Sequence, residues 1–173
     1  MSMPVRRVRA ASVRPRGRQR RKLVWATRDQ SGSTLAAGAT ARADLVNNLE
    51  VAGASTLGMT VARVHLALVI NWTTTDATLG ADVGILPSTT LQIASVVADT
   101  AVGEDWMLLT ICPPALCPNT TLVGTNLTGG IRFDLRAKRK LDELNQHLYF
   151  VITNPGSGSI TWGIRARTLC MLP

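Results

Sequence analysis

The sequence has few of the residues on which catalysis and metal binding depend. Its 173 residues include only two histidines and three cysteines. Both histidines, His65 and His147, lie in apolar runs that predict strands, and no serine lies in a Gly-x-Ser-x-Gly elbow. Cys112 and Cys117 lack the second pair of ligands that a structural zinc site needs. The sequence therefore predicts a protein that is not an enzyme and has no cofactor and no metal site.

Long hydrophobic runs are also missing. The longest apolar stretches have the length of a strand and fall well short of the ~18 residues of a membrane-spanning helix. The N-terminus begins with basic residues but has no apolar stretch typical of a secretory signal. An odd number of cysteines argues against a disulfide framework. We therefore expect a chain that folds in a reducing compartment and has no membrane partner.

Negative charge is missing from residues 1–22, where positive charge is concentrated. The segment has no Asp or Glu, and its nine basic residues are Arg6, Arg7, Arg9, Arg14, Arg16, Arg18, Arg20, Arg21 and Lys22. Repulsion between like charges and the scarcity of large apolar side chains predict an unfolded arm. Because guanidinium groups pair with phosphates whatever the base sequence, the arm predicts nucleic-acid binding. A nuclear-import signal is the alternative interpretation.

The remainder of the chain, residues 23–173, is close to neutral. Of the 19 basic residues, ten remain here against all 11 acidic ones, and no Lys or Arg occurs from Val64 to Ile131. A protein that holds nucleic acid in a folded groove would spread basic residues over this region. The sequence therefore predicts two parts, a binding arm at 1–22 and a folded domain at 23–173.

Short apolar and alternating segments predict that this second part is all-β. The predicted strands are residues 23–27, 61–72, 81–86, 106–112, 131–136, 147–153 and 159–169. The first of them is expected to end at the turn-forming residues 29–33. The strand at 61–72 is apolar on both faces, which predicts that both faces are covered.

The remaining segments are less regular. Residues 41–49 fit either a strand or a short helix, and 91–97 and 138–144 are the candidate helices. Residues 73–80 and 113–130 are predicted to be long loops that lie on the outer surface or at subunit contacts. Seven or eight strands at this spacing predict a two-sheet sandwich or a barrel.

A second basic cluster lies near the end of the predicted 131–136 strand. Its members are Arg136, Lys138, Arg139 and Lys140. Since Asp142 and Glu143 follow, the cluster is interpreted either as a salt-bridged surface turn or as a secondary nucleic-acid contact.

Three stretches of the chain carry a family resemblance. One is the basic arm up to Arg20-Arg21-Lys22, followed at once by Leu-Val-Trp. Another is Thr60-Val-Ala-Arg-Val-His-Leu-Ala-Leu-Val. The third is Gln146-His-Leu-Tyr-Phe-Val-Ile-Thr, followed by a turn and a C-terminal strand. With these stretches, the chain resembles the shell-forming coat proteins of small icosahedral viruses with a single jelly roll, in particular those of circular single-stranded DNA viruses such as nanoviruses.

This resemblance implies an eight-stranded jelly-roll sandwich with a disordered basic N-terminal arm. It also implies that many copies of the chain assemble into a closed icosahedral shell around a viral genome. The resemblance favours single-stranded DNA as the cargo, whereas phosphate contacts alone leave DNA and RNA equally open. The expected location is the virion, and the host cell interior, including the nucleus, during assembly.

Two other classes of protein fit parts of the sequence. A cellular β-barrel nucleic-acid-binding protein with a basic tail would carry basic and aromatic residues together on one face of its body, and the gap from Val64 to Ile131 argues against that. A phage head or decoration protein would have less need of the basic arm.

Overall fold

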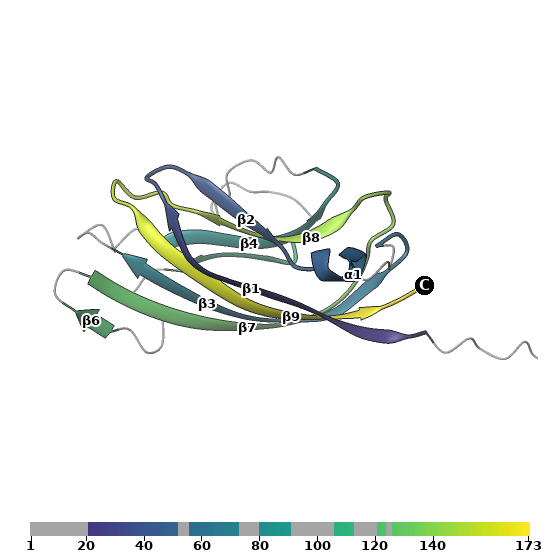
Figure 1. The fold of residues 1–173 in the computed structure, drawn as a ribbon. Helices are drawn as coiled ribbons and strands as arrows, with labels where there is room; N and C mark the ends of the chain where they lie inside the picture. The colour runs from purple at the N-terminus through teal and green to yellow at the C-terminus, as the bar shows by residue number, and fades with distance from the viewer. Residues whose placement is uncertain (1–20, 52–55, 73–79, 91–105, 113–120, 124–125) are drawn as a thin grey trace, which may run out of the picture.

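The fold is a sandwich of two antiparallel sheets (Figure 1). The computed structural model describes residues 21–51, 56–72, 80–90, 106–112, 121–123 and 126–173. Sheet A contains, in order, β1 (Leu23–Leu35), β9 (Ile160–Met171), β3 (Thr60–Trp72), β7 (Asn126–Lys140) and β6 (Thr121–Val123). Sheet B contains, in order, β2 (Thr40–Asp44), β8 (His147–Thr153), β4 (Ala81–Ser88) and β5 (Leu108–Cys112). One helix, α1 (Asn47–Val51), follows β2.

The strand order is that of a jelly roll. Four antiparallel pairs are nested along the chain, β1 with β9, β2 with β8, β3 with β7, and β4 with β5. Successive pairs alternate between sheet A and sheet B, and the pairings of β3 with β9 and β4 with β8 complete the two sheets. This nesting is the double Greek key that defines the jelly roll. The predicted all-β jelly-roll sandwich is therefore confirmed, with the short β6 added at one edge of sheet A.

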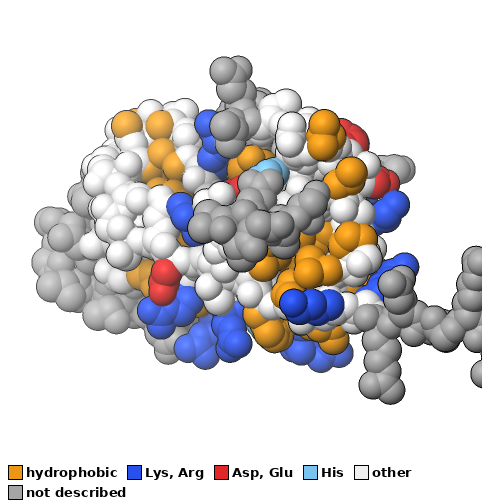
Figure 2. All heavy atoms as spheres, turned by 45° about the vertical axis from the view of Figure 1, so that its right-hand side comes forward, with side chains coloured by type: hydrophobic (Ala, Val, Ile, Leu, Met, Phe, Trp, Pro, Cys, Tyr) orange, Lys and Arg blue, Asp and Glu red, His pale blue; other side chains and the backbone are white. Residues whose placement is uncertain are grey.

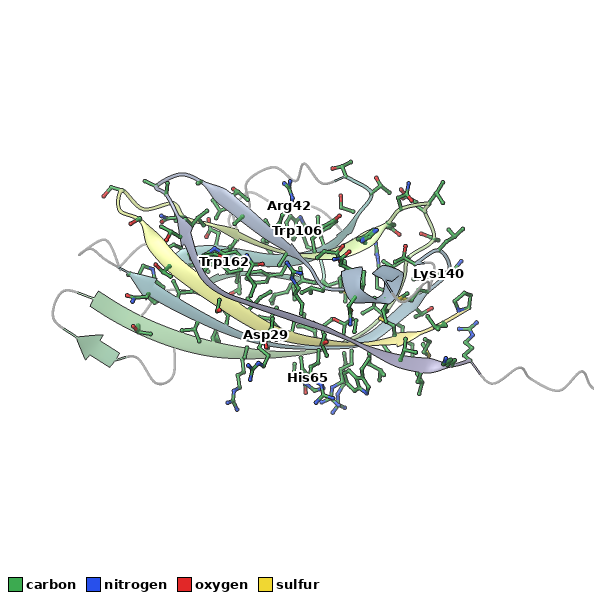
Figure 3. The ribbon with its side chains drawn as sticks, in the orientation of Figure 1. Asp29, Arg42, His65, Trp106, Lys140 and Trp162 are labelled. Atoms are coloured by element: carbon green, nitrogen blue, oxygen red, sulfur yellow. The ribbon has the colours of Figure 1, made fainter. Side chains whose placement is uncertain are left out.

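The core lies between the sheets because each strand turns every second side chain inward. On β3, the inward residues Val64, Leu66, Leu68 and Ile70 are almost completely buried. Trp162 of β9, which lies between the two sheets (Figure 3), meets Phe150 of β8 across the core, and their ring centroids are 5.7 Å apart. The two largest fully buried side chains thus connect the two sheets directly.

Part of the outer face of sheet B is apolar as well. Tyr149 and Val151 of β8 are buried there against Trp106. The Trp106 ring lies over Gly84 so closely that a Cβ on Gly84 would be 2.3 Å from it. Glycine is therefore required at position 84, and the nearly unbroken apolar sequence of β8 reflects burial on both faces.

The first half of the chain departs from the predicted boundaries. The turn-forming residues after Arg28 do not end the first strand, which continues to Leu35 with an irregularity between Gln30 and Ser33. Gly32 takes a positive φ of 70° there, which accommodates the bulge. The ambiguous segment 41–49 contains both predicted elements, since Asp44 ends β2 and accepts a hydrogen bond from the Val46 amide just before α1.

Three further predictions were wrong. Residues 138–144 form no helix, because β7 continues to Lys140 in pairing with β3. Residues 121–130 are not a loop, since β6 and the start of β7 form a hairpin. The strand β3 is covered on only one side, and Val69 on its other face is 50% exposed. The segments 73–79, 91–97 and 113–120 lie outside the described residues. In the part of the chain that is described, no helix has the length and apolar character needed to cross a bilayer.

Burial makes the thiol of Cys170 chemically inert. The residue is completely inaccessible on the inner face of β9, and desolvation raises its pKa from 9.0 to about 12. At pH 8 the shift lowers the reactive thiolate fraction about a thousandfold. We expect iodoacetamide to label Cys170 only after unfolding, as measured by mass spectrometry of peptides from native and guanidinium-treated protein. Equal labelling of native and unfolded protein would contradict this packing.

Candidate nucleic-acid interface

The outer face of sheet A is polar and open. Strands β1, β9, β3 and β7 lie side by side, so their outward residues form rows across the sheet. Three neighbouring rows are Trp25-Leu169-Arg63-Arg136, Thr27-Arg167-His65-Asp134 and Asp29-Arg165-Ala67-Arg132. Figure 3 shows Asp29 and His65 on this side of the sandwich, whereas Arg42 and Trp106 lie on the side of sheet B.

Basic side chains predominate on this face. Six of the ten basic residues of segment 23–173 project from it: Arg63, Arg132, Arg136, Lys138, Arg165 and Arg167. The carboxylates among the same outward positions are Asp29 and Asp134. Six positive charges facing two negative ones leave an excess of four. Figure 2 shows Lys and Arg side chains gathered along the lower edge of the molecule, where sheet A lies.

Two ion pairs use the two carboxylates. Arg63 donates hydrogen bonds of 2.7 and 2.5 Å to Asp134, which lower the pKa of that carboxyl, and His65 Nδ1 lies 3.5 Å from the same side chain. Arg165 Nε lies 3.0 Å from Asp29. In the described portion of the chain, no carboxylate pairs with Arg132, Arg136, Lys138 or Arg167. These four cations are available to an anionic ligand.

An aromatic side chain lies among these charges. The indole of Trp25 is 42% exposed, and it stacks with the His65 imidazole at a centroid distance of 5.8 Å. The guanidinium carbon of Arg167 lies 5.0 Å from the centre of the indole ring, within range of a cation–π contact. Trp25 is thus held in place by its neighbours while much of its surface remains accessible.

The face is hollowed beside this cluster. Arg165 and Arg132 flank the small Ala67 from the two adjacent strands, about 9.5 Å apart across the sheet. A shallow depression of about 260 Å³ lies here, lined by both arginines, Arg167, His65 and Ala67. In the next row Gly163 and Gly130 flank Val69, and a second hollow begins there. Short residues in the middle and long cations at the sides form a shallow trough.

The predicted secondary contact is only partly assembled on this face. Arg136 and Lys138 line a depression with Arg63, and Lys140 is exposed near the end of β7. Arg139 is half-buried, opposite Val61. The cluster belongs to a strand, so the interpretation as a surface turn was wrong; the turn begins only after Lys140.

The predicted binding arm adjoins the same sheet. Arg21 and Lys22 are exposed and lead into β1, and the Lys22 carbonyl accepts a hydrogen bond from the Leu172 amide. The remaining arm residues, Arg6 to Arg20, lie outside the described residues. In Figure 1 the start of β1 and the C-terminus lie at the same end of sheet A.

Sequence reasoning missed this face because it depended on the gap in basic residues from Val64 to Ile131. The gap contains β4 and β5, which belong to sheet B, together with the part of β3 beyond Arg63, the short β6 and the start of β7. Arg63 before the gap lies in β3, and most of the basic residues after the gap lie in β7 and β9, which both pair with β3. The alternation of Arg132, Asp134 and Arg136 was a visible signal, but not the pairing that adds Arg63, Arg165 and Arg167.

The described histidines and cysteines lie in surroundings that indicate structural roles. His147 Nδ1 lies 2.5 Å from an oxygen of Asp44, and the pair joins β8 to β2. Cys112 and Cys170 are buried and have no disulfide. Within the described ranges, no three side chains of His, Cys, Asp or Glu lie close enough to hold a metal ion.

Comparisons with known proteins add little. No protein-family model matches the sequence, and none of the curated proteins matches it significantly. Among solved structures, a chain of Cocksfoot mottle virus is similar, with a TM-score of 0.38 and 12% sequence identity over 99% of this chain and 96% of that chain. The assignment of a jelly roll therefore depends on the strand order itself.

Proposed function

We propose that this chain is a viral coat protein whose jelly-roll body assembles into a closed shell and whose N-terminal arm packages the genome. The observation that carries the proposal is the position of the arm: nine basic residues without an acidic one lead directly into the first strand of a jelly roll. The arm would condense nucleic acid by neutralising phosphates, and the near-neutral body would tile the shell.

Identical subunits would assemble into the shell by repeating the same contacts. A closed icosahedral shell, an extension of closed point-group symmetry, contains about 60 copies of one chain or a multiple of that number. Each copy contributes one arm, so many weak phosphate contacts act together on one genome. Binding of this kind is independent of base sequence and sensitive to salt. By analogy with the family resemblance, the cargo is single-stranded DNA and the mature location is the virion.

A second candidate is favoured by the basic outer face of sheet A. A cellular nucleic-acid-binding protein with a basic tail would carry basic and aromatic residues together on its body, as Trp25, Arg167 and their neighbours do. Such a protein would bind nucleic acid as a monomer or small oligomer, and it would not form particles.

Expression of the full-length chain distinguishes the two candidates. We expect uniform particles by electron microscopy and an elution volume in size-exclusion chromatography far smaller than that of an 18.5 kDa monomer. The particles are expected to contain nucleic acid, detected by ultraviolet absorbance and identified as DNA or RNA by nuclease digestion. A monomer at high concentration, with and without added nucleic acid, would overturn the coat-protein proposal.

A further inference from the structure

We propose that the outer face of sheet A binds single-stranded nucleic acid, with the indole of Trp25 stacking on a base and the surrounding cations contacting phosphates. The inference takes nucleic acid as the ligand class from the proposed function. It adds a second site, on the folded body, and a preference for unpaired strands.

The surroundings of Trp25 are those of a stacking platform. The ring is 42% exposed, although an indole in a β-sandwich has an apolar core available in which to be buried. The other described tryptophans of sheet A, Trp72 and Trp162, are 3% and 1% exposed. His65 and Arg167 hold the ring in place, so a base that stacks on it meets a side chain with little remaining freedom to lose.

The cations around Trp25 are positioned to contact the phosphates of a nucleic-acid strand that passes over its ring. Arg136 lies at the β7 end of the Trp25 row, Lys138 lies on one side of that row, and Arg132 lies on the other side, at the trough beside Ala67. None of the three has a carboxylate partner in the part of the chain that is described. Phosphates that precede and follow a stacked base can therefore each meet a cation.

The geometry favours a single strand over a duplex. In a duplex the faces of the bases are stacked on one another, so an indole on an open sheet reaches only the backbone. In a single strand a base is free to stack on an aromatic side chain while its phosphates follow a basic groove. Trp25 lies three residues after Lys22, so a strand gathered by the arm is already close to the platform.

The test compares ligands that share charge but differ in accessible bases. Trp25→Ala is made in the full-length chain, and binding is measured for oligo(dT), for a duplex of equal length and for heparin. We expect oligo(dT) affinity to fall about tenfold, because one stacked base is lost. Affinity for heparin is expected to stay within about twofold, since electrostatic contacts of the arm need no base.

Matched variants separate stacking from folding and charge. Trp25→Phe keeps an aromatic face and is expected to restore most of the oligo(dT) affinity. Trp25→Phe is also expected to abolish the quenching of tryptophan fluorescence by oligo(dT), because the indole that stacks on the base is gone. If Trp25 had only a structural role, its replacement would not change the quenching. Leu144→Ala removes a 72% exposed apolar side chain elsewhere, and Arg42→Ala removes an exposed charge on sheet B; both are expected to bind like the wild type.

The outcomes distinguish this inference from the coat-protein proposal. Particles of the wild type, combined with oligo(dT) affinity unchanged in Trp25→Ala, would overturn the stacking site and leave the shell intact. Equal losses for oligo(dT) and heparin would also overturn it, since they would show a general loss of charge or fold. A wild type that forms no particles but loses base-dependent binding in Trp25→Ala would support the site and overturn the shell.

Discussion

Replacing Trp162 by alanine is expected to remove about 3–5 kcal/mol from the free energy of unfolding. Trp162 is the largest fully buried side chain, it is 1% exposed, and its ring meets Phe150 of the opposite sheet at 5.7 Å. The truncation leaves a cavity between two sheets that cannot close without shifting both. Domains of this size have a total stability of about 5–15 kcal/mol, so the variant would be marginal or unfolded. Denaturation by guanidinium, followed by circular dichroism, measures the change.

Trp162→Phe is the matched control. The indole nitrogen of Trp162 has no hydrogen-bond partner among the described residues, so phenylalanine loses volume but no hydrogen bond. A ring also remains against Phe150, which preserves part of the aromatic contact. We expect less than half of the loss seen with alanine. A stability for Trp162→Ala within about 1 kcal/mol of the wild type would mean that the two sheets do not pack through this pair.

The inner faces of the sandwich were predictable because they follow local alternation. Strand alternation in the sequence puts Ile160, Trp162 and Ile164 on one face, and all three are buried on the inner side of β9. The same rule puts Ile131, Phe133 and Leu135 opposite their charged neighbours, and these three side chains pack against the core. A two-residue period is a property of the strand itself and needs no knowledge of its partners.

Boundaries and coverage were harder to predict because they depend on pairing. Ser31 and Gly32 have turn chemistry, yet the hydrogen bonds between β1 and β9 continue on both sides of them. The segment 138–140 carries good helix formers, yet pairing with β3 keeps it extended. In both cases tertiary hydrogen bonds outweigh a local preference. The outer face of β3 stays open although its sequence is apolar; there Ala67 is flanked by Arg165 and Arg132, and Val69 is flanked by Gly163 and Gly130.

The candidate interface was also hard to predict from the sequence, because it depends on which strands pair. The positions of the charges are plain in the sequence, and charged residues alternate with apolar ones in the segments that form β7 and β9. What the sequence did not reveal is that β3 lies between β7 and β9, which brings Arg63, Arg136 and Arg167 to one face. A neutral net charge for residues 23–173 therefore coexists with a surface that carries an excess of four positive charges.

Deleting residues 2–22 is expected to weaken nucleic-acid binding by about a thousandfold or more at moderate salt. The deletion removes nine of the 19 basic residues of the chain and no acidic residue. Each phosphate contact on a single strand contributes roughly −0.7 to the slope of log affinity against log salt, so nine contacts contribute up to about −6. The remaining slope reports the contacts of the outer face of sheet A, with its excess of four charges. Titration of oligo(dT) at several salt concentrations measures both slopes.

An arm of the same length in which all eight arginines are replaced by glutamine separates charge from chain length. We expect it to bind as weakly as the deletion, because the glutamine arm keeps its reach and loses all but the charge of Lys22. Both variants retain residues 23–173, so their circular dichroism spectra and thermal unfolding are expected to match those of the wild type. If the deletion kept the affinity and the salt slope of the full chain, the folded body would be the principal binding site. The basic face around Trp25 would then carry the function that we assign to the arm.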